Sequence, residues 1–189
     1  VCSSDLQLGV FGQEDAKEFL MAIPGHFKLI DQQLNYGNIA SGFETKAKPN
    51  LILDLSLSYD ELKKAYSNNN IRNIRKAEKK ELIHETTSSP DKLISLFKSY
   101  RGKSIATLSE KDYRTLRKIC NKALLNGMLE IRTVKDRNGD LQAGAVFLHS
   151  LHGWIFLFSA THPDGRNTGA MSSLIDRRSE EHTSELQSP

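Results

Sequence analysis

One stretch of the chain decides most of the fold: MLEIRTVKDRNGDLQAGAVFLHS, residues 128–150. Residues 128–135 and 141–149 are strand-like runs, and Asn138-Gly139 joins them. Asn-Gly between two such runs is the strongest short-range hairpin signal, because the tight turn needs residues that accept positive φ. The stretch therefore predicts two adjacent antiparallel strands.

A third apolar run lies just beyond the hairpin, at residues 154–159. Since its apolar residues would fall on both faces of a strand, it predicts a strand that is covered on both sides. The polar segment Thr161–Thr168 then predicts a loop, and residues 169–177 predict the beginning of a helix.

The residues that precede the hairpin carry mainly helical signals. Helices are expected at residues 13–23, 58–66, 71–80, 89–100 and 109–126, with a break or bend at Ser67–Asn70, and strands at 27–34, 51–55 and 82–86. Helices, a strand meander and a strand–loop–helix unit together predict an α/β (α+β) fold.

The composition excludes several classes of protein. The 189 residues include 26 Lys+Arg and 23 Asp+Glu, and 38% are hydrophobic, which is typical of a globular chain rather than a disordered one. No run reaches the roughly 18 apolar residues that a membrane span needs, so we expect no span.

The two ends of the chain are related to each other at the DNA level. The codons AGA TCG GAA GAG CAC AC encode the start of the tail at Arg178, and their reverse complement encodes Val1–Asp5 and the start of a Leu6 codon. This short DNA looks like a sequencing-library adapter. We therefore expect residues 1–6 and 178–189 to be adapter-like additions, and residues 7–177 to form a single, incomplete domain.

The expected domain is more basic than the whole chain. Residues 7–177 number 171, with 25 basic and 19 acidic side chains, because the ends hold one base and four acids. Cys120 is then the single cysteine, which suits a reducing compartment and favours a cytoplasmic protein.

The segment after the third strand could bind an anion. Gly169 and Ala170 would let a ligand approach the first N–H groups of the next helix, and Arg166 would add a full charge. The segment Arg166, Asn167, Thr168, Gly169 and Ala170 is therefore a candidate phosphate or pyrophosphate cradle. The alternative is an ordinary loop that Thr168 caps.

A second candidate is the basic stripe on the helix expected at residues 71–80. Arg72, Arg75 and Lys76 share one face of that helix, with Lys79 close by. Such a stripe suits phosphates, nucleic acid or an anionic surface, and its alternative is a solvated helix face. No His/Cys/Asp/Glu set has metal-ligand spacing, so no metal site is expected.

Two of these segments resemble a known family. The run Arg72-Asn-Ile-Arg-Lys-Ala77 is similar to a segment common in Fem-type proteins, the FemAB-like branch of the GNAT (N-acetyltransferase) superfamily. The order of Ala143–Phe147, the strand at 154–159 and Gly165–Ala170 also resembles that family's central strand, loop and following helix. The likeness extends over roughly residues 50–177.

The resemblance implies a GNAT-like mixed, mostly antiparallel sheet flanked by helices, truncated on its C-terminal side. It implies a bacterial transferase that moves an acyl group from acetyl-CoA or another acyl-CoA to an amine. Arg166-x-x-Gly169 matches the family's pyrophosphate loop, although the last small residue falls on Ala170, one place early. The basic stripe Arg72, Arg75 and Lys76 would then bind the substrate.

Two alternatives to acyl-CoA chemistry stay open. One is a FemAB-like ligase that uses aminoacyl-tRNA and acts on peptidoglycan precursors. The other is a non-catalytic module that binds anions or nucleic acid. For either enzyme the acid and base are unassigned, with Glu130, Asp164 and Tyr113 available.

The family's remaining strands would follow the helix that starts at Gly169. Their absence predicts that the strand at 154–159 is exposed along one edge. It also predicts that this chain is inactive even where its parent gene encodes an active acyltransferase.

Overall fold

The computed structural model describes residues 10, 15–35, 37–47, 53–54, 56–150 and 153–187. The chain divides into two compact units, one within residues 2–52 and the other within residues 53–189. The larger unit holds a four-stranded sheet of order β1-β2-β3-β4 in which all neighbours are antiparallel. Its strands are β1 Ile83–Thr87, β2 Leu129–Lys135, β3 Leu141–Ser150 and β4 Gly153–Thr161. The predicted mixed α/β fold class is confirmed.

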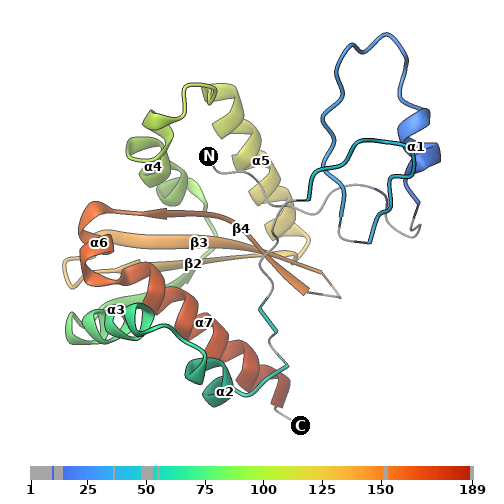
Figure 1. Ribbon diagram of the computed structural model, residues 1–189. Helices are drawn as coiled ribbons and strands as arrows, with labels where there is room; N and C mark the ends of the chain where they lie inside the picture. The colour runs from blue at the N-terminus through green and yellow to red at the C-terminus, as the bar shows by residue number, and fades with distance from the viewer. Residues whose placement is uncertain are drawn as a thin grey trace. The chain divides into compact units, whose positions relative to one another are not determined.

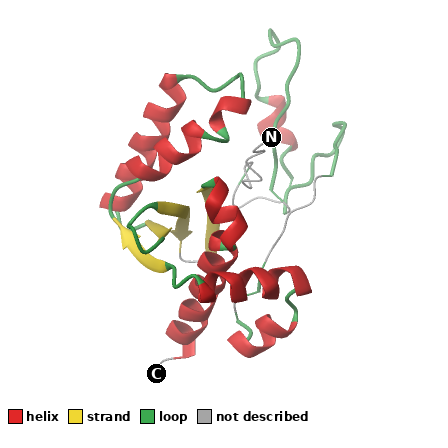
Figure 2. Ribbon diagram, turned by 90° about the vertical axis from the view of Figure 1, so that its left-hand side faces the viewer, coloured by secondary structure: helices red, strands yellow, loops and turns green. Residues whose placement is uncertain are grey.

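Helices cover both faces of this sheet (Figures 1 and 2). They are α2 Tyr59–Lys64, α3 Asn68–Lys79, α4 Asp91–Ser99, the 3-10 helix η1 Gly102–Ser104, α5 Glu110–Leu125, α6 Pro163–Thr168 and α7 Ala170–Gln187. Helices α4 and α5 lie on one face, and α2, α3 and α7 lie on the other (Figure 1).

Each face of the sheet has its own apolar core. Under α4 and α5 the core includes Leu93, Ile94, Phe97, Cys120, Ile131, Val146 and Phe158. Under α7 it consists of Val134, Ala143, Ala145, Phe147, Ala170 and Leu174. Side chains alternate between the two faces along β2 and β3, because successive residues of a strand point to opposite sides.

The predicted hairpin is confirmed, and one carboxylate holds its turn. Asp136 Oδ1 accepts the N–H groups of Asn138 at 2.9 Å and of Asp140 at 3.0 Å. Gly139 takes φ +84°, the left-handed conformation that glycine adopts without steric cost. The local chemistry of the turn therefore fixes the pairing of β2 with β3.

Capping side chains define the starts of α2 and α3. Ser58 N–H donates to the Glu61 carboxylate at 2.9 Å, and Glu61 N–H donates to Ser58 Oγ at 3.4 Å. Ser67 Oγ accepts from Asn70 N–H at 3.2 Å, so α3 begins at Asn68. The predicted break at residues 67–70 thus lies earlier, at residues 65–67, because Ser67 is a cap.

Strand β4 differs from the prediction of coverage on both sides. Its register shifts between Val146 and Phe147 of β3, which pair with Phe158 and Phe156 and leave Leu157 as an extra residue. This bulge turns Phe158 toward α4, whereas Phe156 lies against Phe147 on the α7 side. Phe158 is buried, but Phe156 is 48% exposed. The side chains in the first half of β4 are therefore not covered on both faces. Within the described residues β4 is an edge strand, in agreement with the prediction that one of its edges is exposed.

The predicted loop Thr161–Thr168 is wrong for most of its length, because α6 occupies Pro163–Thr168. His162 caps α6, since its Nδ1 accepts Asp164 N–H at 3.3 Å. Pro163 takes the first helical position, where a missing N–H costs nothing.

The helix predicted from residue 169 is confirmed as α7. It passes the boundary expected at Arg177 and continues to Gln187. Arg178, Ser179 and Thr183 are buried, so this part of the helix packs on the rest of the unit.

The described part of residues 2–52 contains little regular structure. It holds one helix, α1 Lys17–Met21, which is shorter than predicted, and one parallel bridge between Asp15 and Ile39. Residues 27–34 form no strand, and most of the strand predicted at 51–55 lies outside the described residues. Large apolar side chains of this unit are exposed: Phe19, Met21, Phe27, Leu29, Ile30, Ile39 and Phe43.

Candidate functional site

A pocket of about 340 Å³ lies between the end of α4, η1 and α6. Its lining consists of Ser99, Tyr100, Arg101, Ser104, Pro163 and Arg166. Two arginines and three residues with hydroxyl groups thus line one cavity that is open to solvent. Guanidinium groups donate paired hydrogen bonds to phosphate and carboxylate oxygens, so the lining suits an anion.

A close approach at Gly102 shapes one wall of the pocket. A Cβ on Gly102 would overlap the hydroxyl oxygen of Tyr113 on α5 and lie 3.3 Å from the Phe97 carbonyl oxygen. Any larger residue at this position would therefore have to displace the Tyr113 side chain. The turn brings Arg101 and Ser104 together, and the Ser104 hydroxyl donates to the Arg101 carbonyl at 2.8 Å.

A hydrogen bond joins the two walls of the pocket. Tyr100 Oη lies 2.7 Å from His162 Nε2, and the two rings meet edge to face at 5.0 Å between centroids. His162 Nδ1 lies 3.4 Å from the Asp164 carboxylate and also accepts Asp164 N–H. The C-terminal end of α4 is thereby tied to the start of α6.

The predicted donor-binding segment is divided by the structure. Arg166 lines the pocket, and Asn167 is exposed beside it on α6. The Thr168 hydroxyl donates to the Gly165 carbonyl at 3.2 Å, within the last turn of α6. Of the predicted segment 166–170, Arg166 is therefore the residue that lines the pocket.

The prediction that Gly169 and Ala170 let a ligand approach the first N–H groups of α7 is wrong. A Cβ on Gly169 would overlap the Asn73 carbonyl oxygen and lie 2.8 Å from its carbonyl carbon. Ala170 is fully buried. The space that the sequence analysis assigned to a ligand is filled by the backbone of α3, because α6, α7 and α3 pack together at this point.

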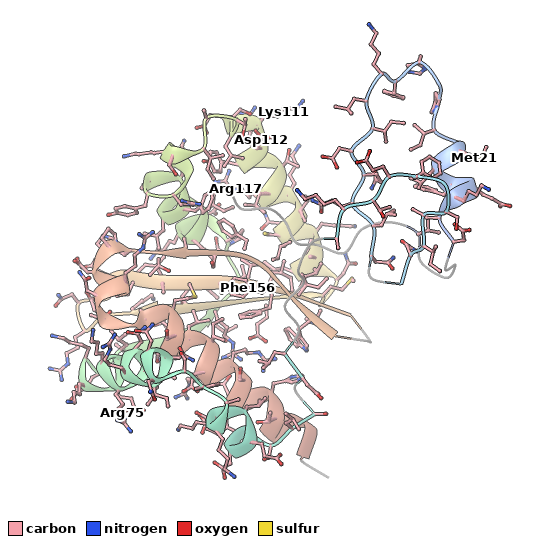
Figure 3. The ribbon with its side chains drawn as sticks, viewed as in Figure 1. Met21, Arg75, Lys111, Asp112, Arg117 and Phe156 are labelled. Atoms are coloured by element: carbon pink, nitrogen blue, oxygen red, sulfur yellow. The ribbon has the colours of Figure 1, made fainter. Side chains whose placement is uncertain are left out.

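The predicted basic stripe lies on the exposed side of α3. Arg72, Arg75 and Lys76 are exposed, while Ile74 and Ala77 are buried against the rest of the unit. Figure 3 shows Arg75 projecting away from the sheet. These three side chains are not among those that line the pocket with Arg166.

The three acid–base candidates fall in different surroundings. Asp164 lies beside His162, next to the pocket. Glu130 pairs with Arg132 and with Arg178, whose Nε lies 3.1 Å from its carboxylate. Tyr113 is buried against Gly102 and is therefore part of the wall behind the pocket.

A second polar group of side chains lies between α7 and the sheet. The Arg178 guanidinium stacks 4.4 Å from the centre of the Trp154 ring and pairs with Glu130. Ser173 Oγ lies 3.0 Å from His84 Nε2. Burial lowers the pKa of His84, and the Arg177 charge lowers it further.

Two tyrosines surround a buried carboxylate on α7, Asp176. Tyr59 Oη donates to Asp176 Oδ1 at 2.9 Å. Burial, assisted by Asp176, raises the pKa of Tyr66 to about 12 and raises that of Tyr59 as well. These contacts hold α2 and α3 against α7.

No family model and no curated protein matches this chain. In the part of the chain that the structure describes, no group of three or more His, Cys, Asp or Glu side chains could hold a metal ion. None of the helices described there is both long enough and apolar enough to cross a membrane.

Proposed function

We propose that this chain carries the donor-binding part of an acyltransferase, which holds the phosphate groups of an acyl-CoA in the pocket between Arg101 and Arg166. The observation that carries the proposal is that Arg101 and Arg166, from distant parts of the chain, line the same pocket. The GNAT-like reading is supported by the antiparallel sheet, by the helices on both of its faces, and by the position of Arg166 just after β4.

The size of the pocket bears on which part of the donor it holds. Whole-ligand sites span about 300–1,000 Å³, and this pocket of about 340 Å³ lies at the small end. The pocket therefore suits the pyrophosphate of the acyl-CoA and the atoms next to it. The acyl-bearing arm of the acyl-CoA would extend out of the pocket over the protein surface. Strand β4 leads into α6, and one edge of β4 has no neighbouring strand in the described residues, so its backbone donors and acceptors are available.

The proposed reaction is aminolysis of a thioester. The neutral amine of the acceptor attacks the acyl carbonyl carbon, the new C–N bond forms, and the C–S bond breaks. The amine proton passes to the departing thiolate, either directly or through a base. The protein contributes mainly by positioning the two reactants and by donating hydrogen bonds to the developing oxyanion, for which the β4 edge near Phe158 is proposed.

Binding is the direct test of this proposal. Isothermal titration would measure the affinity of the full chain for CoA, with Arg166→Ala and Arg101→Ala as site variants. Arg114→Ala is the matched control, because Arg114 is exposed on α5 and its loss changes the net charge equally. Since hydrogen bonds between charged groups contribute roughly 1.5–3 kcal/mol, each site variant should weaken binding about tenfold or more.

Arg114→Ala should bind CoA as the unaltered chain does. Absence of CoA binding by the unaltered chain would overturn the proposal. An equal loss in all three variants would also overturn it, because it would reduce the effect to net charge.

A second candidate function rests on α3. Among the described residues, none of the ion pairs involves Arg72, Arg75 or Lys76, so their charges face solvent. Such a stripe would suit tRNA, either in an aminoacyl-tRNA-dependent ligase or in a binding module. Affinity for tRNA would then fall steeply with salt, and the double variant Lys79→Glu, Lys80→Glu would weaken it without affecting CoA binding.

A further inference from the structure

We infer that the Tyr100 hydroxyl is the third anion-binding group of the pocket, and that His162 sets the direction in which its hydrogen points. This inference rests on the proposed function, and it adds an uncharged hydrogen-bond donor beside Arg101 and Arg166. The ligand class is a phosphate or pyrophosphate group of a phosphate ester.

The first step concerns the two nitrogens of His162. Nδ1 accepts the backbone N–H of Asp164 at 3.3 Å, because His162 is the N-cap of α6. A neutral imidazole that accepts at one nitrogen carries its proton on the other. The Asp164 carboxylate also lies 3.4 Å from Nδ1, but its side chain is 74% exposed, so water weakens its attraction for a proton there. With Nδ1 as the acceptor of Asp164 N–H, the neutral ring carries its proton on Nε2.

The second step follows from the contact of His162 with Tyr100. Nε2 lies 2.7 Å from Tyr100 Oη, a short hydrogen bond. Because Nε2 carries the proton, the phenol oxygen is the acceptor. The phenol hydrogen of Tyr100 is then left to donate elsewhere.

The third step places that hydrogen in the pocket. Tyr100 lines the cavity and is 40% exposed, and His162 occupies one side of its hydroxyl oxygen. The chain of donors runs from His162 Nε2–H to Tyr100 Oη–H to an oxygen of the ligand. Hydrogen bonds in series polarise one another, so this phenol is a stronger donor than a free one. None of the six lining residues is an aspartate or a glutamate, and the neighbouring Asp164 carboxylate is 74% exposed to solvent, which screens its charge.

The experiment measures binding and the tautomer separately. The full chain would be titrated with pyrophosphate and with CoA at about pH 8, above the usual titration range of histidine. Tyr100→Phe removes the hydroxyl and should weaken pyrophosphate binding about fivefold to tenfold. Tyr59→Phe is the matched control, because it removes a hydrogen-bonded tyrosine hydroxyl that lies outside the pocket.

Two His162 variants separate orientation from simple packing. His162→Leu should weaken binding by a similar factor. His162→Gln should restore most of it, since the amide can both accept Asp164 N–H and donate to Tyr100. Nitrogen-15 NMR of the imidazole in the free protein should show the proton on Nε2.

Each outcome decides between the inference and the proposed function. Proton placement on Nδ1, or pyrophosphate binding that Tyr100→Phe leaves unchanged, would overturn the role of Tyr100. If CoA bound with dependence on Arg166 alone, the proposed function would stand without this inference. If pyrophosphate bound through Tyr100 but CoA did not bind, the inference would stand and the acyl-CoA donor would be wrong. If neither probe bound, both would fall.

Discussion

Replacing Gly169 with alanine should lower the free energy of unfolding far more than replacing Gly139, in the hairpin turn, with alanine. Gly169 has φ +76°, and its Cβ would overlap the Asn73 carbonyl oxygen on α3. Left-handed backbone costs a non-glycine residue about 1–2 kcal/mol, and overpacking adds ~1–3 kcal/mol. The expected loss in the free energy of unfolding for Gly169→Ala is therefore about 2–5 kcal/mol.

The chain supplies a control for each part of that cost. Gly139 has φ +84° with nothing within 4 Å of its Cβ position, so Gly139→Ala carries the backbone cost alone, about 1–2 kcal/mol. A Cβ on Gly165 would overlap the Gln142 carbonyl oxygen, and Gly165 has no positive φ, so Gly165→Ala carries the overlap alone, ~1–3 kcal/mol. The entropy that alanine removes from the unfolded chain is common to all three variants.

Urea unfolding followed by far-ultraviolet circular dichroism measures the three losses. The loss for Gly169→Ala should approach the sum of the other two. A loss equal to that of Gly139→Ala would refute the reasoning, because it would mean that Gly169 has open space beside it. That result would restore the ligand-facing role that the sequence predicted for this residue.

Three further predictions concern the rest of the chain. Arg178→Ala should lower the free energy of unfolding by about 3 kcal/mol and shift the fluorescence of Trp154. The reason is that the buried Arg178 guanidinium stacks on the Trp154 ring and pairs with Glu130. An unchanged fluorescence spectrum and an unchanged urea midpoint would contradict this. Burial holds the pKa of His84 below its usual value, so as the pH falls below about 6.5 the unfolded chain takes up a proton more readily and stability declines. The urea midpoint should fall between about pH 7.5 and 5.5, and His84→Gln should remove most of that fall, whereas an equal fall in the variant would exclude His84 as the cause. Hydrogen exchange followed by mass spectrometry should find residues 15–47 almost unprotected and β3 strongly protected, because exposed loops open more readily than paired strands; equal protection would contradict the difference in packing.

Local chemistry made part of the fold predictable. Asn138-Gly139 dictates its hairpin, and Ser58 with Glu61 dictates the start of α2, because each signal acts within four residues. Helix α6 carried a signal as well, since Pro163 follows a capping residue and Gly169 ends the helix. Its polar composition made it look like a loop.

The pocket was only half predictable. Arg166 lies seven residues after the third apolar run, so its place in the segment that follows a strand could be inferred from the sequence. Arg101 lies 65 positions earlier, and tertiary packing that no local signal encodes brings it to the same cavity. The role of Gly169 was misjudged because a glycine that admits a ligand and a glycine that admits another helix look the same in sequence.

The position of α7 has a consequence for the synthesis of the protein. The helix follows all four strands along the chain, and it supplies Ala170 and Leu174 to the core on its face of the sheet. On the ribosome, β2 and β3 can pair and close their first core with α4 and α5 while α7 is still inside the exit tunnel. The face that carries Val134, Ala143 and Ala145 then stays exposed to water until the first turns of α7 emerge. The nascent chain is therefore a half-covered sheet for that interval, which is the period in which a chaperone would find apolar surface to bind.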